Sequence, residues 1–143
     1  MGLQMRNSKP ILLVDDDPAD AMIVRRAFED LKLTNPLIHS NNGKEALDYL
    51  RSEGNKKPSV ILLDSNMPKM DGSEFLKIVK ADDVLKMIPV VVLTTCSDEQ
   101  HIAEQLELGV AGYVIKPVNY KNFLEAIRVI HRYWTLSELP NVG

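Results

Sequence analysis

The stretch Val60-Ile61-Leu62-Leu63-Asp64 is an apolar run that ends in a carboxylate, and the polar segment SNMPKMDG (residues 65–72) follows it. Such a run predicts a buried strand that leads into a loop. In open α/β sheets, ligands bind outside the carboxyl ends of the parallel strands. Asp64 is therefore a candidate for chemistry, although Asp also ends many strands because it favours turns.

Three further apolar runs have the length of strands and end at polar or proline residues. They are Ile11–Val14 before Asp15-Asp16-Asp17-Pro18, Val90–Leu93 before Thr94-Thr95, and Tyr113–Ile115 before Lys116-Pro117. If these strands are parallel, their carboxyl ends meet at one edge of the sheet. Acids, a hydroxyl and an ammonium at one edge are the groups needed to bind Mg²⁺ and to handle a phosphoryl group.

Helical patterns alternate with the strands along the whole chain. Apolar residues at helical spacing (Ile23, Ala27, Phe28 and Leu31) predict a helix after the first strand. Residues 36–40 predict a weak strand, and further helices are expected after Asn42-Gly43, over 73–81, over 97–109, and from near Asn119 to Trp134. Five β-α units without an extra linker predict a three-layer α/β sandwich.

Length and composition favour one soluble domain. The chain has 143 residues and a net charge of −3, so the sequence does not indicate a basic surface that binds nucleic acid. No apolar run approaches the roughly 18 residues needed to cross a bilayer, and residues 1–9 lack the apolar core of a signal peptide. Cys96 is the single cysteine, which excludes an internal disulfide and a cysteine metal site. We expect a cytoplasmic protein without direct membrane contact.

Asp64 can attack phosphorus only as a carboxylate, with the charge on the phosphoryl oxygens neutralised. Mg²⁺ prefers oxygen ligands, which Asp15, Asp16 and Asp64 and the backbone carbonyl of Asn66 can supply. One of the acids at 15–17 can instead cap the helix that starts near Pro18. Three adjacent acids repel one another unless a cation joins them, so we expect at least one raised carboxylate pKa without metal.

The combined residues resemble the receiver domain of two-component response regulators over residues 10–134. The resemblance rests on ILLVDDDP (11–18), DSNMP (64–68), Asp71-Gly72, Leu93-Thr94 and Lys116-Pro117. It implies a flavodoxin-like fold, with a parallel sheet of order 2-1-3-4-5 and a site at the switch point of the strand order.

The same resemblance implies a role for each site residue. Asp64 would be the phosphoacceptor, Asp15 and Asp16 would bind Mg²⁺ with the Asn66 carbonyl, Thr94 and Lys116 would contact the phosphoryl group, and Tyr113 would be the aromatic that turns inward on activation. Pro117 would fix the turn that directs the Lys116 ammonium, because Xaa-Pro bonds restrict the chain. His39, His101 and His131 lack metal spacing, and we assign them no role.

Three further positions near the site bear on how it reacts: one departs from the commonest family pattern, and two match positions that tune dephosphorylation. Thr95 replaces the usual small Ala beside the switch hydroxyl, which is expected to narrow access to the phosphoryl group. Asn66 and Cys96 occupy positions that tune dephosphorylation in the family. Cys96 can also be read as a small apolar loop residue, and we favour that over redox sensing.

The ending RYWTLSELP (132–140) is longer than a minimal receiver domain. It resembles that of small single-domain regulators associated with bacterial phytochrome kinases, in which the extension supports dimers. We therefore expect residues 1–9 to form a flexible tail, 10–134 the receiver domain and 135–143 an extension that joins the last helix in a homodimer. The alternative is that Trp134 merely closes the core.

The favoured interpretation is a stand-alone response regulator that accepts a phosphoryl group on Asp64 from a histidine kinase or phosphotransfer protein. It would signal by a conformational switch and protein contact. Its only catalysis would be self-phosphorylation and dephosphorylation. One alternative is a degenerate receiver that binds partners without phosphate. Another is a haloacid-dehalogenase-type phosphohydrolase, but such enzymes carry a second Asp where this chain has Asn66.

Overall fold

The computed structural model describes residues 9–64, 72–94, 103, 106–116 and 119–138. In this part of the chain, five parallel strands form one sheet in the order β2-β1-β3-β4-β5. The strands are β1 (Ile11–Val14), β2 (Leu37–Ser40), β3 (Val60–Asp64), β4 (Val90–Thr94) and β5 (Gly112–Ile115). The predicted flavodoxin-like order 2-1-3-4-5 is confirmed.

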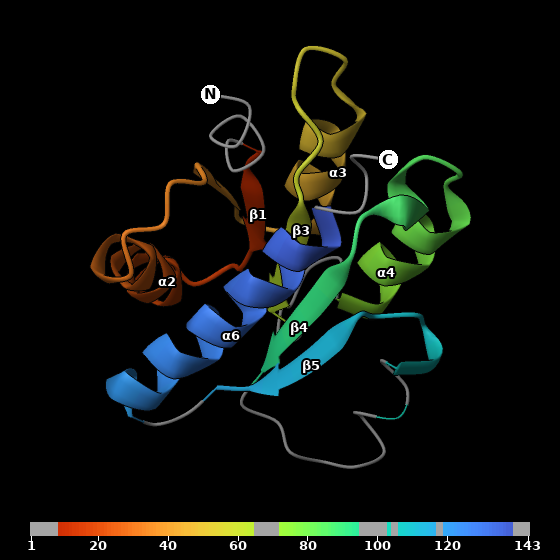
Figure 1. Cartoon of the computed structure of the whole chain (residues 1–143). Helices are drawn as coiled ribbons and strands as arrows, with labels where there is room; N and C mark the ends of the chain where they lie inside the picture. Colours follow the sequence, from red (N-terminus) through yellow and green to blue (C-terminus); the bar gives the residue numbers. More distant parts are fainter. Residues whose placement is uncertain (1–8, 65–71, 95–102, 104–105, 117–118, 139–143) are drawn as a thin grey trace.

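Helices cover both faces of this sheet and complete the three layers of the predicted sandwich (Figure 1). They are α2 (Pro18–Asp30), α3 (Gly43–Arg51), α4 (Gly72–Ala81) and α6 (Tyr120–Glu138), with a short 3-10 turn η1 (Leu85–Met87) before β4. Helices α2 and α6 pack on one face, and α3 and α4 pack on the other (Figure 1). The apolar pattern of the sequence did not predict the turn η1.

Successive side chains of each strand enter opposite halves of the core, because side chains alternate along a β-strand. In β1, Leu12 and Val14 pack with α3 and α4, whereas Ile11 and Leu13 pack with α2 and α6. All four side chains are fully buried. A parallel sheet that is covered on both faces requires such continuous apolar strands, so this is the physical reason for the runs in the sequence.

Helix α2 buries most of the apolar pattern that predicted it, with one exception. Its buried residues include Ala21, Val24, Ala27 and Phe28, whereas Ile23 is 45% exposed. The predicted helix is therefore present, although Ile23 does not belong to its buried face. The small residue Ala21 and Val24 face the sheet instead, which lets the helix approach it closely.

Helix α6 begins where the sequence predicted, after Asn119. The Asn119 side chain accepts the backbone N–H groups of Lys121 and Asn122, which caps the first turn. Phe123, Ile127 and Ile130 are buried against α2 and the sheet. The domain itself therefore covers these three residues of the apolar stripe. The side chain of Trp134 lies outside the described residues, and α6 continues to Glu138, past the expected domain boundary.

The helix expected over 97–109 lies mostly outside the described residues, although Ala103, Leu106 and Glu107 are helical. Gly109 follows with φ +89°, a left-handed conformation that glycine adopts readily after a helix. No helix in the described part of the chain is long and apolar enough to span a membrane.

Replacing Ile127 by Ala should destabilise the folded domain by about 2–5 kcal/mol, because it opens a cavity where the side chain is fully buried. Urea unfolding followed by circular dichroism would measure this. Val129→Ala, on the same helix but 57% exposed, is the control and should change the free energy of unfolding by no more than about 0.5 kcal/mol. Similar effects of the two variants would show that the buried stripe of α6 is misassigned.

Candidate functional site

The site lies at the carboxyl ends of β1 and β3, where the strand order changes direction. Val14 lies opposite Leu63 in the sheet, so Asp15 and Asp64 follow at the same level on neighbouring strands. Both residues are buried, with 1% and 4% of their surface exposed. Two buried carboxylates side by side require a cation, because charge is costly to remove from water without a partner.

The three acids after β1 have separate positions. Asp17 caps α2, since its Oδ1 accepts the backbone N–H of Ala19 at 2.9 Å. The Oδ1 of Asp15 accepts the N–H of Asp17 at 2.9 Å, and its side chain enters the site. Asp16 is exposed. The sequence predicted that one of these acids would cap the helix, and the structure identifies it as Asp17.

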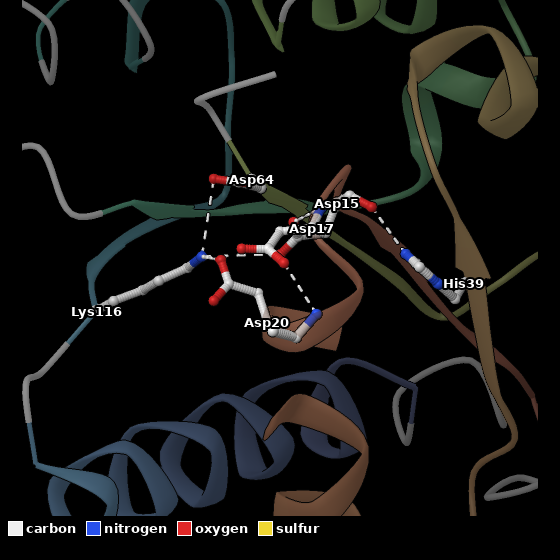
Figure 2. A network of polar contacts seen from close by, with 7 residues as sticks. Asp15, Asp17, Asp20, His39, Asp64 and Lys116 are labelled. Atoms are coloured by element: carbon white, nitrogen blue, oxygen red, sulfur yellow. Dashed lines mark hydrogen bonds and ion pairs between the residues drawn. The ribbon is translucent and has the colours of Figure 1, made fainter. Parts of the chain in front are cut away.

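Lys116 provides the cation at this edge of the sheet, directly after β5 (Figure 2). Its Nζ lies 3.8 Å from Asp15 Oδ2 and 3.8 Å from Asp64 Oδ1. It donates a hydrogen bond of 3.0 Å to Asp20 Oδ2, in the first turn of α2. Asp15, Asp64 and Lys116 lie together as the strand ends predict, whereas Asp20 belongs to no strand-end run and has no signal in the sequence pattern.

The carboxylates also form a group that fits a divalent cation. One oxygen each of Asp15, Asp20 and Asp64 lies within 4.8 Å of the others, and these are the hard oxygen donors that Mg²⁺ or Mn²⁺ prefers. Among the described residues, Asp16 does not join this group, although the sequence placed it among the ligands. The chain bends at Asp16, between β1 and α2, and leaves Asp16 exposed while Asp15 is buried.

The electrostatics of the site follow from burial and crowding of charge. Burial raises the pKa of Asp15 to about 7, and the charge of Asp64 adds to the rise, although the Asp17 N–H and Lys116 oppose it. Burial by itself would lower the pKa of Lys116, but Asp64, Asp20 and Asp15 together outweigh it and raise that pKa. The expected raised carboxylate pKa is therefore found at Asp15, with burial as its largest cause.

His39 contacts the same loop from the other side (Figure 2). Its Nε2 lies 2.7 Å from the backbone carbonyl oxygen of Asp15, which can only accept, so Nε2 carries the proton in this contact. Strand β2 ends at Ser40, so the Asp15 carbonyl lies beyond the paired part of the sheet and accepts from the His39 side chain. We had assigned His39 no role, and no spacing pattern in the sequence indicates this contact.

The remaining predicted site residues are only partly visible. Thr94 is the last residue of β4, and its side chain lies outside the described residues. Tyr113 on β5 is half-buried and packs against the core beside α3 and α4. Asn66, Thr95, Cys96 and Pro117 also lie outside the described residues, so their assigned roles stay predictions.

Comparison with known proteins identifies the family. Residues 11–128 match the model of the response regulator receiver domain. The chain belongs to this family. Its relatives include the probable methanogenesis regulatory protein FilR2 of Methanothrix harundinacea, which is 40% identical over 87% of this chain and 82% of its own length. The receiver domain is thus homologous to response regulators, which partner with histidine kinases and are in general not enzymes.

Two further relatives have solved structures. Response regulator Rcp1 of Synechocystis is 37% identical over 88% of each chain, and its Mn²⁺-bound crystal structure superimposes with a TM-score of 0.79 over 89% of this chain and 94% of that one. The phosphorylated cyanobacterial phytochrome response regulator RcpA gives a TM-score of 0.81 at 36% identity, with the same coverage. The acidic group described above fits the divalent metal binding that the Rcp1 structure shows for that protein.

Replacing Asp15 by Asn should stabilise the metal-free protein near neutral pH. In the unfolded chain Asp15 loses its proton near its ordinary value of 3.8, but the folded protein holds the proton to about 7. The wild type therefore loses stability as pH rises between these values, and the loss persists above pH 7. The Asn amide keeps an acceptor for the Asp17 N–H and avoids that loss. We expect a gain of about 1–3 kcal/mol at pH 7.5 and almost none at pH 3.5.

Urea unfolding in the presence of a chelator, at both pH values, would measure this difference. Asp48→Asn, at an exposed position of α3, is the matched control and should show no such pH-dependent gain. A gain for Asp15→Asn of equal size at both pH values would contradict the assignment of the raised pKa to Asp15. Addition of Mg²⁺ should favour the wild type and reduce the gain at pH 7.5.

Proposed function

We propose that the chain is a stand-alone response regulator in which Asp64 accepts a phosphoryl group from a histidine kinase or a phosphotransfer protein in the cytoplasm. The observation that carries this proposal is the buried Asp64 carboxylate, placed beside Asp15 and 3.8 Å from the Lys116 ammonium at the end of the central strand. The family of the chain supports the reaction class.

The proposed reaction needs few groups. An Asp64 oxygen attacks the phosphorus of a phosphohistidine, the P–N bond breaks, and the imidazole leaves with its electron pair and takes up a proton. This forms an aspartyl phosphate on Asp64. Lys116 can pair with the new phosphoryl oxygens because it already lies within ion-pair distance of Asp64. Thr94, next to it on the carboxyl edge, would donate a hydrogen bond from its hydroxyl.

Mg²⁺ is the proposed metal, held by Asp15, Asp16, Asp64 and the backbone carbonyl of Asn66. When bound, it would neutralise charge on the transferred phosphoryl group. The grouped oxygens of Asp15 and Asp64 and the raised pKa of Asp15 support a cation at this place. In the described part of the chain, Asp16 does not join that group, so its assignment rests on the family resemblance. Self-phosphorylation by small phosphodonors and self-dephosphorylation would be the only catalysis, tuned by Asn66, Thr95 and Cys96.

Signalling would follow from a population shift between two conformations. Phosphorylation would draw Thr94 and Lys116 toward Asp64, and Tyr113 would turn inward to fill the released space. Tyr113 is half-buried on β5, an edge strand of the sheet, so its movement would change a surface that partners can reach. The resemblance of the ending to regulators of phytochrome kinases makes a phytochrome-like kinase the first partner to test.

The two alternatives are less well supported. A phosphate-independent receiver would not need an ammonium held among three carboxylates, which Lys116 provides here. A haloacid-dehalogenase-type phosphohydrolase would need a second Asp as general acid two residues after the nucleophile, and Asn66 stands there.

The phosphoacceptor can be tested with acetyl phosphate and Mg²⁺. Intact-mass spectrometry should show one phosphoryl group on the wild type and none on Asp64→Asn or Asp64→Ala, because only a carboxylate at the strand end can attack. Including both variants controls for deamidation of the new Asn. A phosphoryl group on Asp64→Ala would place the acceptor elsewhere.

We also propose a homodimer formed by the last helix and residues 135–143. Because Phe123, Ile127 and Ile130 are buried in the domain itself, the contact would use the exposed side of α6, including Val129, together with the apolar residues of the ending. Truncation after Tyr133 should convert a dimer to a monomer in light scattering. A monomeric full chain at high micromolar concentration, with and without a phosphoryl mimic, would disprove the dimer.

A further inference from the structure

The Lys116 ammonium is bound most closely by a carboxylate to which the proposed reaction gives no role. Its Nζ lies 3.0 Å from Asp20 Oδ2, which is a hydrogen bond, and 3.8 Å from the nearest oxygens of Asp15 and Asp64. A distance of 3.8 Å permits ion pairing but exceeds hydrogen-bond length. In this structure Lys116 is therefore turned toward Asp20 (Figure 2).

Asp20 differs from the other two carboxylates in its surroundings. Its side chain is 37% exposed, whereas those of Asp15 and Asp64 are 1% and 5% exposed. It belongs to the first turn of α2, so the helix dipole favours its charge even without Lys116. This hydrogen bond does not involve Asp64, so Asp20 can keep the ammonium when the charge at Asp64 changes.

We propose that Asp20 is a positioning residue that holds Lys116 away from Asp64 and competes with the phosphoryl group for the ammonium. This inference rests on the proposed function, because the competition matters only if Asp64 carries a phosphoryl group. The phosphorylated form gains its contact with Lys116 only by weakening the contact with Asp20. Asp20 therefore lowers the stability of the active form and sets the threshold of the switch.

Beryllofluoride, which binds a carboxylate as a phosphoryl mimic, allows an equilibrium test at saturating Mg²⁺. NMR titration should show that Asp20→Asn binds it about three- to tenfold more tightly than the wild type, as expected when one competing charge-assisted hydrogen bond is removed. Asp17→Asn is the matched control: it removes one negative charge from the same helix end and keeps a side chain that can cap α2. Its affinity should stay within about twofold of the wild type, because Asp17 is exposed and its charge is screened.

A double-mutant cycle with Lys116→Met separates competition from a general charge effect. Without the ammonium, Asp20→Asn should no longer tighten beryllofluoride binding, because Asp20 and the mimic on Asp64 then have no cation for which to compete. A gain that persists in Lys116→Met would overturn the proposal, and so would an Asp20→Asn effect no larger than that of Asp17→Asn. Weaker binding by Asp20→Asn would mean that Asp20 directs Lys116 toward the phosphoryl group, which also contradicts competition.

The Mg²⁺ affinity of the same variants provides an independent check. An Asp20 oxygen lies in the acidic group that fits a divalent cation, but the proposed role of Asp20 is to bind Lys116. Asp20→Asn should therefore weaken metal binding no more than Asp17→Asn does. A much larger loss for Asp20→Asn would make Asp20 a metal ligand and would overturn the inference. If the wild type takes neither beryllofluoride nor a phosphoryl group from acetyl phosphate, the proposed function itself fails. If it takes both and only the Asp20 comparison fails, the proposed function stands.

Discussion

Three carboxylates around one ammonium are the constraint on which the site depends. Asp15 and Asp64 are buried at the ends of neighbouring strands, where neither charge is well solvated. Lys116 relieves this only in part, because Asp15 still has its pKa raised to about 7. The negative charge of the site therefore exceeds its positive charge. A divalent cation, or a change of charge at Asp64, strongly alters the electrostatic energy of these buried groups.

The rigid parts of the fold hold this balance in place. Asp15, Asp64 and Lys116 lie at the carboxyl ends of three strands of one sheet. Asp17 caps α2, and the first turn of α2 contributes the contact at Asp20. His39 reaches across from the edge strand to hold the Asp15 carbonyl. Hydrogen bonds thus hold the described segment between β1 and α2, whereas the Lys116 ammonium has three carboxylate acceptors at 3.0–3.8 Å.

Much of the fold and the centre of the site could be predicted from the sequence, because parallel strands bring their carboxyl ends together and apolar runs mark those strands. The residues that reasoning missed act through side-chain reach. Asp20 lies one turn inside a helix and His39 on an edge strand, and neither spacing nor composition shows where such side chains point. Ile23 belongs to the apolar pattern of α2 yet is 45% exposed, whereas Ala21, outside that pattern, is buried.

Because both faces of the sheet are buried, the apolar pattern of the strands does little to fix their register. Leu12 and Leu13 enter opposite halves of the core, so a slip of one residue would exchange one apolar side chain for another at little cost in burial. The charged strand ends prevent this, because a slip of β1 or β3 would pull Asp15 or Asp64 into the apolar layer between the helices. The acids at the site thus also help to fix the register of the strands. Replacing both by apolar residues would weaken that register as well as remove the reactive carboxylates.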